Sequence, residues 1–331
     1  MKVLVLRFSS IGDIVLTTPV VRCLKNQTGA TVHFLCKEAF RSVVEANPYI
    51  DRVFTFQKNV SEVLPALKAE QYDVVIDLHR NLRSMQVKWN LGRTSYTFDK
   101  LNFEKWLLVN LKINRLPDTH IVDRYMAAVA PLGVQYDGLG LDFFIPEGTG
   151  WQNSAQAQHI PAGPYTAFVM GATHATKRLP EEKMVDICRR LDHPVVLLGG
   201  KSEADMGRRV ALAAGAHVID LCGQLSLYES ASVVRDAARV LTHDTGLMHI
   251  AAAFRKPIVS VWGNTVPEFG MYPFYPTGAD DNTSFEVNGL SCRPCSKIGF
   301  AKCPKGHFSC MNDIPNEAVA ARLNSLNAPK K

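Results

Sequence analysis

Short apolar runs alternate with helix-length segments along most of the chain, and this alternation restricts the fold more than any other feature. In the first half, runs typical of strands lie at residues 3–6, 32–36, 52–56, 74–78 and 95–98. In the second half they lie at residues 166–170, 195–198, 218–221, 239–242 and 258–262. Strands separated by helices in this way form parallel sheets with crossover helices. We therefore expect an α/β protein in which each half is a doubly wound, Rossmann-like unit.

The length of the chain favours two domains. Its 331 residues exceed what one hydrophobic core usually supports. Residues 147–164 are rich in Gly, Pro, Gln and Asn and lack apolar periodicity, so we expect the linker there. We predict an N-terminal domain at 1–150, a C-terminal domain at 164–313, and a further helix from the pattern of residues 316–326.

Composition is that of an ordinary globular protein, with 47% hydrophobic and 21% charged residues. No window approaches the ~20 uninterrupted apolar residues of a membrane span. The chain starts with a strand pattern instead of a charged segment followed by an apolar one, so we expect it to stay in the cytoplasm.

The most informative local pattern is a strand, a tight turn and a helix at residues 238–254. Asp244, Thr245 and Gly246 form the turn, and His249 lies one helical turn further along. The free N–H groups and the dipole of such a helix start attract an anion, most simply a nucleotide phosphate. Asp244 and Thr245 also accept hydrogen bonds from a ribose or a sugar. The alternative is an ordinary N-cap, because Asp and Thr favour helix starts in any α/β protein.

A second strand, turn and helix opens the chain, with a helix expected from Ile14 to Lys25. The turn contains only Gly12, so it lacks the Gly-x-Gly-x-x-Gly of dinucleotide binders, which argues against a dehydrogenase. Gly200-Lys201-Ser202 imitates the end of a P-loop, but Val195 stands where that motif needs glycine. The remaining chemical group of the first turn is the carboxylate of Asp13, for which helix capping is the alternative.

Three motifs together resemble one known family. They are Ser-Ser-Ile-Gly-Asp at 9–13 followed by Thr17, Thr18 and Pro19, Thr-Lys-Arg-x-Pro at 176–180, and Asp-Thr-Gly-x-Met-His-x-Ala-Ala at 244–252. In this order and spacing they are similar to the ADP-heptose:lipopolysaccharide heptosyltransferases, glycosyltransferase family 9. The resemblance runs from Met1 to about Asp313. It implies a GT-B fold, in which two Rossmann-like domains face each other across a cleft, and residues 314–331 as a terminal segment that crosses back to the first domain.

The resemblance also implies an activity. It indicates metal-independent, inverting transfer of a heptosyl group from ADP-heptose to the lipopolysaccharide inner core, with no cofactor. Asp13 matches the catalytic base, which takes the proton of the acceptor hydroxyl. Lys177 matches the lysine that neutralises the leaving diphosphate. The implied donor-binding residues are Thr173, Thr176, Lys177, Glu203, Asp244, Thr245, Gly246 and His249.

Three of these residues, Thr173, Thr176 and Glu203, have weaker support from the sequence pattern. In some family members two adjacent threonines precede the lysine by four or five positions, whereas here Thr173 and Thr176 are separated. Glu203 resembles the carboxylate that holds the ribose hydroxyls, and a solvated Glu at a helix start is the alternative. The sequence leaves open a GT-B transferase for another nucleotide sugar and a non-catalytic nucleotide-sugar binding module.

Positive charge is concentrated in residues 79–117, which carry a local excess of six charges together with Trp89 and Trp106. We predict a basic surface with apolar anchors that suits an anionic lipid headgroup or the inner-membrane surface. A solvated helix face beside core aromatics is the alternative, and no nucleic-acid-reading motif accompanies the charge. On the side of the anionic acceptor, the candidate residues are Ser10, Gly12, Arg80 and Arg83.

The eight cysteines fall into two groups. Four are isolated in apolar segments and are typical of buried small residues, whereas Cys292, Cys295, Cys303 and Cys310 lie within 19 residues of one another, close to His307. In a reducing cytoplasm this second group predicts either a zinc site or a reduced structural loop. The spacing is not that of two matched Cys-x2-Cys pairs, and we predict no catalytic metal.

Overall fold

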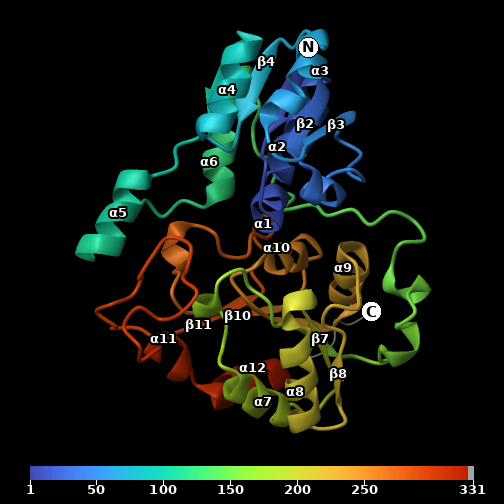
Figure 1. Cartoon of the computed structure of the whole chain (residues 1–331), viewed down its shortest axis with the longest axis vertical. Helices are drawn as coiled ribbons and strands as arrows, with labels where there is room; N and C mark the ends of the chain where they lie inside the picture. The colour runs from blue at the N-terminus through green and yellow to red at the C-terminus, as the bar shows by residue number, and fades with distance from the viewer. Residues whose placement is uncertain (327–331) are drawn as a thin grey trace. The chain divides into compact units, whose positions relative to one another are not determined.

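A computed structural model, which describes residues 1–326, divides the chain into two compact units (Figure 1). Unit 1 comprises Met1–Leu101, Thr119–Phe144 and Pro276–Gly278. Unit 2 comprises Asn102–Asp118, Ile145–Tyr275 and the chain from Ala279 onward. Each unit has its own parallel sheet, as the alternating pattern predicts.

The sheet of unit 1 has five parallel strands in the order β3-β2-β1-β4-β5. Their bounds are β1 Lys2–Leu6, β2 Thr31–Lys37, β3 Arg52–Phe56, β4 Val74–Asp77 and β5 Thr94–Thr97. The helices of this unit are α1 Ile11–Val15, α2 Thr18–Thr28, α3 Leu64–Ala69, α4 Leu82–Leu91 and α6 Ile121–Ala127. A buried cluster that includes Leu4, Leu6, Phe56 and Val87 joins the sheet to α4.

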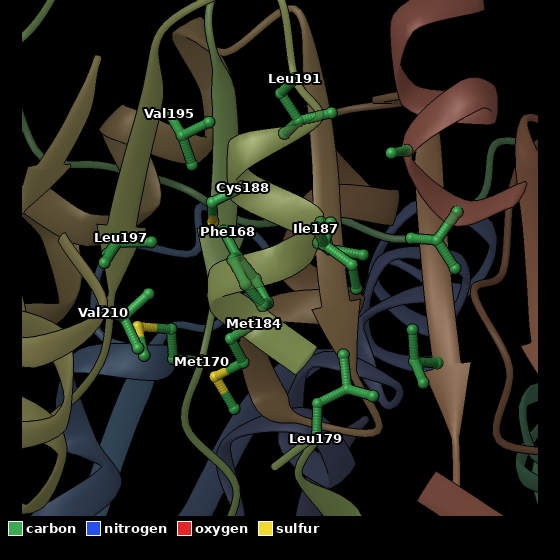
Figure 2. Close-up of a cluster of buried hydrophobic side chains, with 14 of the residues drawn as sticks. Phe168, Met170, Leu179, Met184, Ile187, Cys188, Leu191, Val195, Leu197 and Val210 are labelled. Atoms are coloured by element: carbon green, nitrogen blue, oxygen red, sulfur yellow. The ribbon is translucent and has the colours of Figure 1, made fainter. Parts of the chain in front are cut away.

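The sheet of unit 2 has six parallel strands in the order β11-β10-β9-β6-β7-β8. Their bounds are β6 Thr166–Val169, β7 Val195–Leu198, β8 Val218–Asp220, β9 Arg239–His243, β10 Ile258–Trp262 and β11 Asn282–Glu286. The helices are α5 Asn102–Leu111, α7 Glu181–Arg189, α8 Ala204–Ala214, α9 Leu227–Asp236, α10 Gly246–Ala253, α11 Ser309–Asn312 and α12 Asn316–Ser325. Figure 2 shows Met184, Ile187 and Cys188 of α7 beside Phe168 of β6, in the core of the unit. Within residues 1–326, no helix combines the length and the apolar content needed to cross a bilayer.

The single helix expected at residues 14–25 is wrong, because α1 ends at Val15 and α2 begins at Thr18. The physical reason is Pro19, which has no N–H to donate to the carbonyl of Val15 four residues earlier. The hydroxyl of Thr18 donates to that carbonyl instead, at 2.8 Å. Asp13 consequently lies in the first turn of a separate short helix.

Three expectations about domain organisation differ from the structure. Residues 102–118 belong to unit 2, and the boundary after the first unit falls at Phe144 instead of near 150. Residues 314–326 belong to unit 2, because α12 packs on α7 and buries Val319, Ala320 and Leu323 in the core of that unit. Residues 327–331 of that predicted segment lie outside the described part of the chain. The edge strand β11 was missed because its Asn, Thr, Ser and Glu residues do not form an apolar run.

Candidate functional site

Both sheets reverse their strand order at one point, and the predicted site residues follow the strands that flank these points. In unit 1 the reversal lies between β1 and β4, and in unit 2 between β6 and β9. Doubly wound sheets bind ligands outside the carboxyl ends of the strands at such reversals. Asp13 follows β1, Lys177 follows β6 and Asp244 follows β9, so the topology of each unit supports these positions.

In unit 1, Asp13 is held by Arg7 and Ser10. Arg7 Nη2 lies 2.6 Å from Asp13 Oδ1, and the backbone N–H and hydroxyl of Ser10 donate to Asp13 Oδ2 at 3.2 and 2.8 Å. The backbone hydrogen bond is the helix capping that the sequence left as the alternative role. About a quarter of the Asp13 side chain remains exposed.

Arg7 also ties the ends of β1 and β4 together. Its Nη1 donates to the carbonyl of Leu78 at 2.6 Å and its Nε to the carbonyl of Ser9 at 3.0 Å. Burial lowers the pKa of this guanidinium, but the charge and hydrogen bond of Asp13, together with Tyr125 and Asp77, more than offset burial and the net shift is upward. The neighbouring His79 has its pKa lowered to about 4, by burial first and then by Arg7. His79 is therefore neutral at physiological pH, and Arg7 carries the positive charge beside Asp13.

The loop after β4 carries two acceptor-side candidates and is organised by the fully buried Asp77. Asp77 accepts hydrogen bonds from the N–H groups of His79 and Arg80 and from the hydroxyl of Ser84, and it pairs with Lys88 at 2.9 Å. Arg80 itself pairs with Asp99 at 3.0 Å. Arg83 is exposed in the first turn of α4, whereas Gly12 is buried inside α1.

In unit 2, Lys177 and Asp244 form a pair across the strand reversal. Lys177 Nζ lies 2.6 Å from Asp244 Oδ2, and the hydroxyl of Thr265 donates to the same oxygen at 2.9 Å. Both charged side chains are mostly buried. An ammonium has three N–H donors, so two remain on Lys177 for an anion.

The N-terminus of α10 adds further donors to this region. Thr245 is its N-cap residue and Gly246 its first residue. The Thr245 hydroxyl is buried and has no hydrogen-bond partner among the described residues. His249 is only 2% exposed, so its imidazole is enclosed within the unit and direct contact with a donor is not supported.

Two other predicted donor-binding residues have different surroundings from those expected. Thr176 is buried, and its hydroxyl both accepts from the N–H of Phe300 and donates to the Phe300 carbonyl, so it holds a loop instead of facing a phosphate. Glu203 is 6% exposed and accepts from the N–H of Gly200, from Ser202 and from Arg178. The alternative of a solvated Glu at a helix start is therefore wrong. Thr173 is exposed in the loop after β6.

The loop that contains the clustered cysteines, residues 292–310, supports the Lys177–Asp244–Thr265 set. The supporting residues of this loop were not identified from the sequence. Arg293 donates to the carbonyls of Gly263 and Thr265 at 2.6 and 3.1 Å and pairs with Glu286 at 2.6 Å. The Asn264 amide donates to the Ser296 hydroxyl at 3.0 Å. Apart from the cysteines, the loop carries no pattern in the sequence that points to the donor side, so only folding reveals these contacts.

The same loop packs closely against the segment that carries Lys177. Gly299 has φ +112°, and a Cβ at this position would lie 2.6 Å from the Cβ of His174. Only glycine adopts that conformation in that space without displacing the neighbouring backbone.

The four clustered cysteines are free thiols in this structure. Cys292 Sγ lies 3.8 Å from His307 Nε2, and burial raises the pKa of Cys310 to about 12. Over residues 1–326, no three His, Cys, Asp or Glu side chains are arranged to hold a metal ion.

A surface pocket of unit 2 shares Arg293 with the supporting loop. Its lining includes Leu108, Asn114, Val266 and Glu268, and none of the predicted donor-binding residues is part of it. The pocket is therefore lined by Arg293, which supports the Lys177–Asp244–Thr265 set, but not by Lys177 or Asp244.

Comparison with known proteins finds relatives over most of the chain. A sequence profile described as "Glycosyltransferase family 9 (heptosyltransferase)" matches residues 60–300. The chain is 28% identical over 322 residues to "Lipopolysaccharide heptosyltransferase 1" of Pseudomonas aeruginosa, covering 90% of this chain and 86% of that protein. It is similar in fold to the E. coli ADP-heptose lps heptosyltransferase II, with TM-score 0.73, 19% identity and 98% of both chains covered. It is also similar to E. coli heptosyltransferase WaaC with ADP, with TM-score 0.62, 26% identity and coverage of 81% and 89%.

Proposed function

Because this chain belongs to glycosyltransferase family 9 and has the GT-B fold, we propose that it transfers a heptosyl group from ADP-heptose to an acceptor in the lipopolysaccharide inner core. The observation that carries the proposal is the Lys177–Asp244–Thr265 set beside the N-terminus of α10. The relatives are named as heptosyltransferases that act on lipopolysaccharide or use ADP-heptose, which supports the choice of donor and acceptor.

Unit 2 would hold the donor. A diphosphate matches the two remaining N–H donors of Lys177 and the backbone N–H groups at the start of α10, whose dipole favours negative charge. The buried Thr245 hydroxyl would gain the hydrogen-bond partner that it lacks without a ligand. Asp244, already oriented by Thr265, would accept from a hydroxyl of the sugar or ribose.

Unit 1 would supply the base. The acceptor hydroxyl would give its proton to the Asp13 carboxylate as its oxygen forms a bond to the anomeric carbon, and the bond from that carbon to the β-phosphate would break to release ADP. Lys177 would stabilise the negative charge that ADP gains, because its ammonium would supply positive charge at the diphosphate without a metal ion. A single in-line displacement inverts the anomeric carbon. Arg7 and Ser10 would act as positioning residues that hold Asp13 in one orientation.

A donor panel tests the proposed substrate. We expect purified full-length protein to transfer sugar from ADP-heptose to a defined Kdo-lipid A or heptosylated core acceptor, and to do so in the presence of EDTA. Turnover with UDP-sugars and none with ADP-heptose would contradict the heptosyl donor while leaving the transferase class intact. Binding of ADP-heptose without transfer to any core acceptor would instead indicate a binding module. Loss of transfer in EDTA, restored by a metal, would contradict metal independence.

Replacing Arg293 with lysine should weaken ADP binding by about tenfold, because buried hydrogen bonds of the guanidinium are lost from a loop that supports the donor residues. A lysine is a compact point charge and does not reproduce the planar fork that reaches Gly263, Thr265 and Glu286 together. Calorimetric titration with ADP measures the change. The matched control is Arg322→Lys, whose Nε contacts the Thr283 hydroxyl elsewhere in unit 2. Equal ADP affinity in Arg293→Lys and the unmodified protein would contradict the supporting role.

A further inference from the structure

Helix α4 presents large apolar side chains to solvent. Leu82 is 79% exposed, Met85 48% and Trp89 86%. Their spacing of three and four residues places them on one face of the helix. We call this set, Leu82, Met85 and Trp89, the outer face of α4.

The opposite face of α4 already packs on the core of unit 1. Val87 is fully buried there and Leu91 packs against the same cluster. A surface helix of a globular protein normally carries polar residues on the side away from its core. The α4 helix is apolar on both sides, so its outer face does not contribute to the core of the unit.

The surroundings of the outer face are positively charged. Residues 79–93 contain four Lys or Arg and no Asp or Glu. Lys88 is used by the buried Asp77 and Arg80 by Asp99. Among the described residues, neither Arg83 nor Arg93 forms an ion pair with an acidic residue, and Arg93 donates a hydrogen bond to the neutral side chain of Gln71. Two positive charges therefore flank the apolar side chains without compensation.

We infer that the outer face of α4 docks on an anionic lipid bilayer, with Trp89 and Leu82 inserted at the headgroup level and Arg83 and Arg93 beside lipid phosphates. Apolar insertion combined with attraction of basic residues to anionic lipid is the established physics of such helices. Three side chains bury on the order of 400 Å², which is about half of what one partner contributes to a stable protein interface. The small area and the uncompensated positive charge favour a bilayer over a second protein. Binding needs no sugar nucleotide, so it is independent of the proposed reaction.

Flotation of the full-length protein with vesicles tests this surface. We expect the protein to float with phosphatidylglycerol-containing vesicles, to bind pure phosphatidylcholine vesicles much more weakly, and to dissociate as salt is raised. The double variant Leu82→Ser/Trp89→Ser should lose at least about tenfold in partition coefficient, since each side chain contributes apolar burial. Arg93→Gln should lose about fivefold on anionic vesicles and little on neutral ones.

The matched control is Leu212→Ser in α8, because Leu212 is 86% exposed but lies in unit 2. This variant should bind vesicles as the unmodified protein does. Circular dichroism and donor titration of the Leu82→Ser/Trp89→Ser protein check that folding and unit 2 are intact. Undiminished flotation of this double variant would overturn the inference, as would equal binding to neutral and anionic vesicles. Concentration-dependent self-association that the double variant abolishes, without vesicle binding, would assign the face to a second copy of the chain and also overturn it.

Discussion

Replacing Asp13 with asparagine should lower kcat by about two to four orders of magnitude, with little change in donor affinity. Asparagine keeps the size of the side chain and an oxygen that accepts from Ser10, but it cannot take up the acceptor proton. Because Asp13 belongs to unit 1 and the proposed donor residues to unit 2, ADP binding should be almost unaffected. Initial rates with saturating acceptor and calorimetric titration with ADP separate the two effects.

The control for this experiment is Asp51→Asn, since Asp51 also accepts a backbone hydrogen bond and pairs with a basic residue, Lys25, but does not follow β1. Its kcat should stay close to that of the unmodified enzyme. An Asp13→Asn protein that is folded and transfers sugar at the unmodified rate would show that the base lies elsewhere. A fall in Tm together with kcat would indicate that the capping of α1 is the main role of Asp13, and Ser10→Ala would then reproduce much of the loss.

Replacing Lys177 with alanine should weaken donor binding and reduce kcat together, by about two to three orders of magnitude in kcat/KM. Two effects add up in this variant. The diphosphate loses a cation, and Asp244 loses the ammonium that neutralises it at 2.6 Å. An uncompensated carboxylate beside a diphosphate is repulsive, so the loss should exceed that of one hydrogen bond.

A double variant distinguishes these two contributions. Lys177→Ala/Asp244→Asn removes the carboxylate charge, and we expect it to bind ADP more tightly than Lys177→Ala alone. Lys183→Ala, at a partly buried lysine of α7, serves as the matched control and should leave kcat/KM unchanged. If Lys177→Ala retains full kcat/KM, the diphosphate is bound without this residue, and the donor half of the proposal is wrong.

The order of strands along the chain could be predicted because it depends on local pattern. Apolar runs of four or five residues separated by helical segments indicate parallel sheets, and the structure confirms two of them. The three motifs were likewise visible, since each occupies a short continuous stretch after a strand. The boundaries of the two units were harder to predict from the sequence. A polar edge strand such as β11 and a helix such as α5 are assigned to a unit only by the residues against which they pack.

The sequence by itself determined the two Rossmann-like halves, the family and the turns that carry Asp13, Lys177 and Asp244, because these follow from periodicity and motif within single segments. Only the tertiary structure decided which groups meet: Arg7 with Asp13, Lys177 with Asp244 and Thr265, and Arg293 with the carbonyls beside them. It also decided that the Thr176 hydroxyl accepts a hydrogen bond from the backbone N–H of Phe300, and that the side chain of Trp89 on α4 is exposed to solvent. The physical reason is that these hydrogen bonds, ion pairs and buried contacts depend on where parallel strands end side by side, and no local pattern encodes that position.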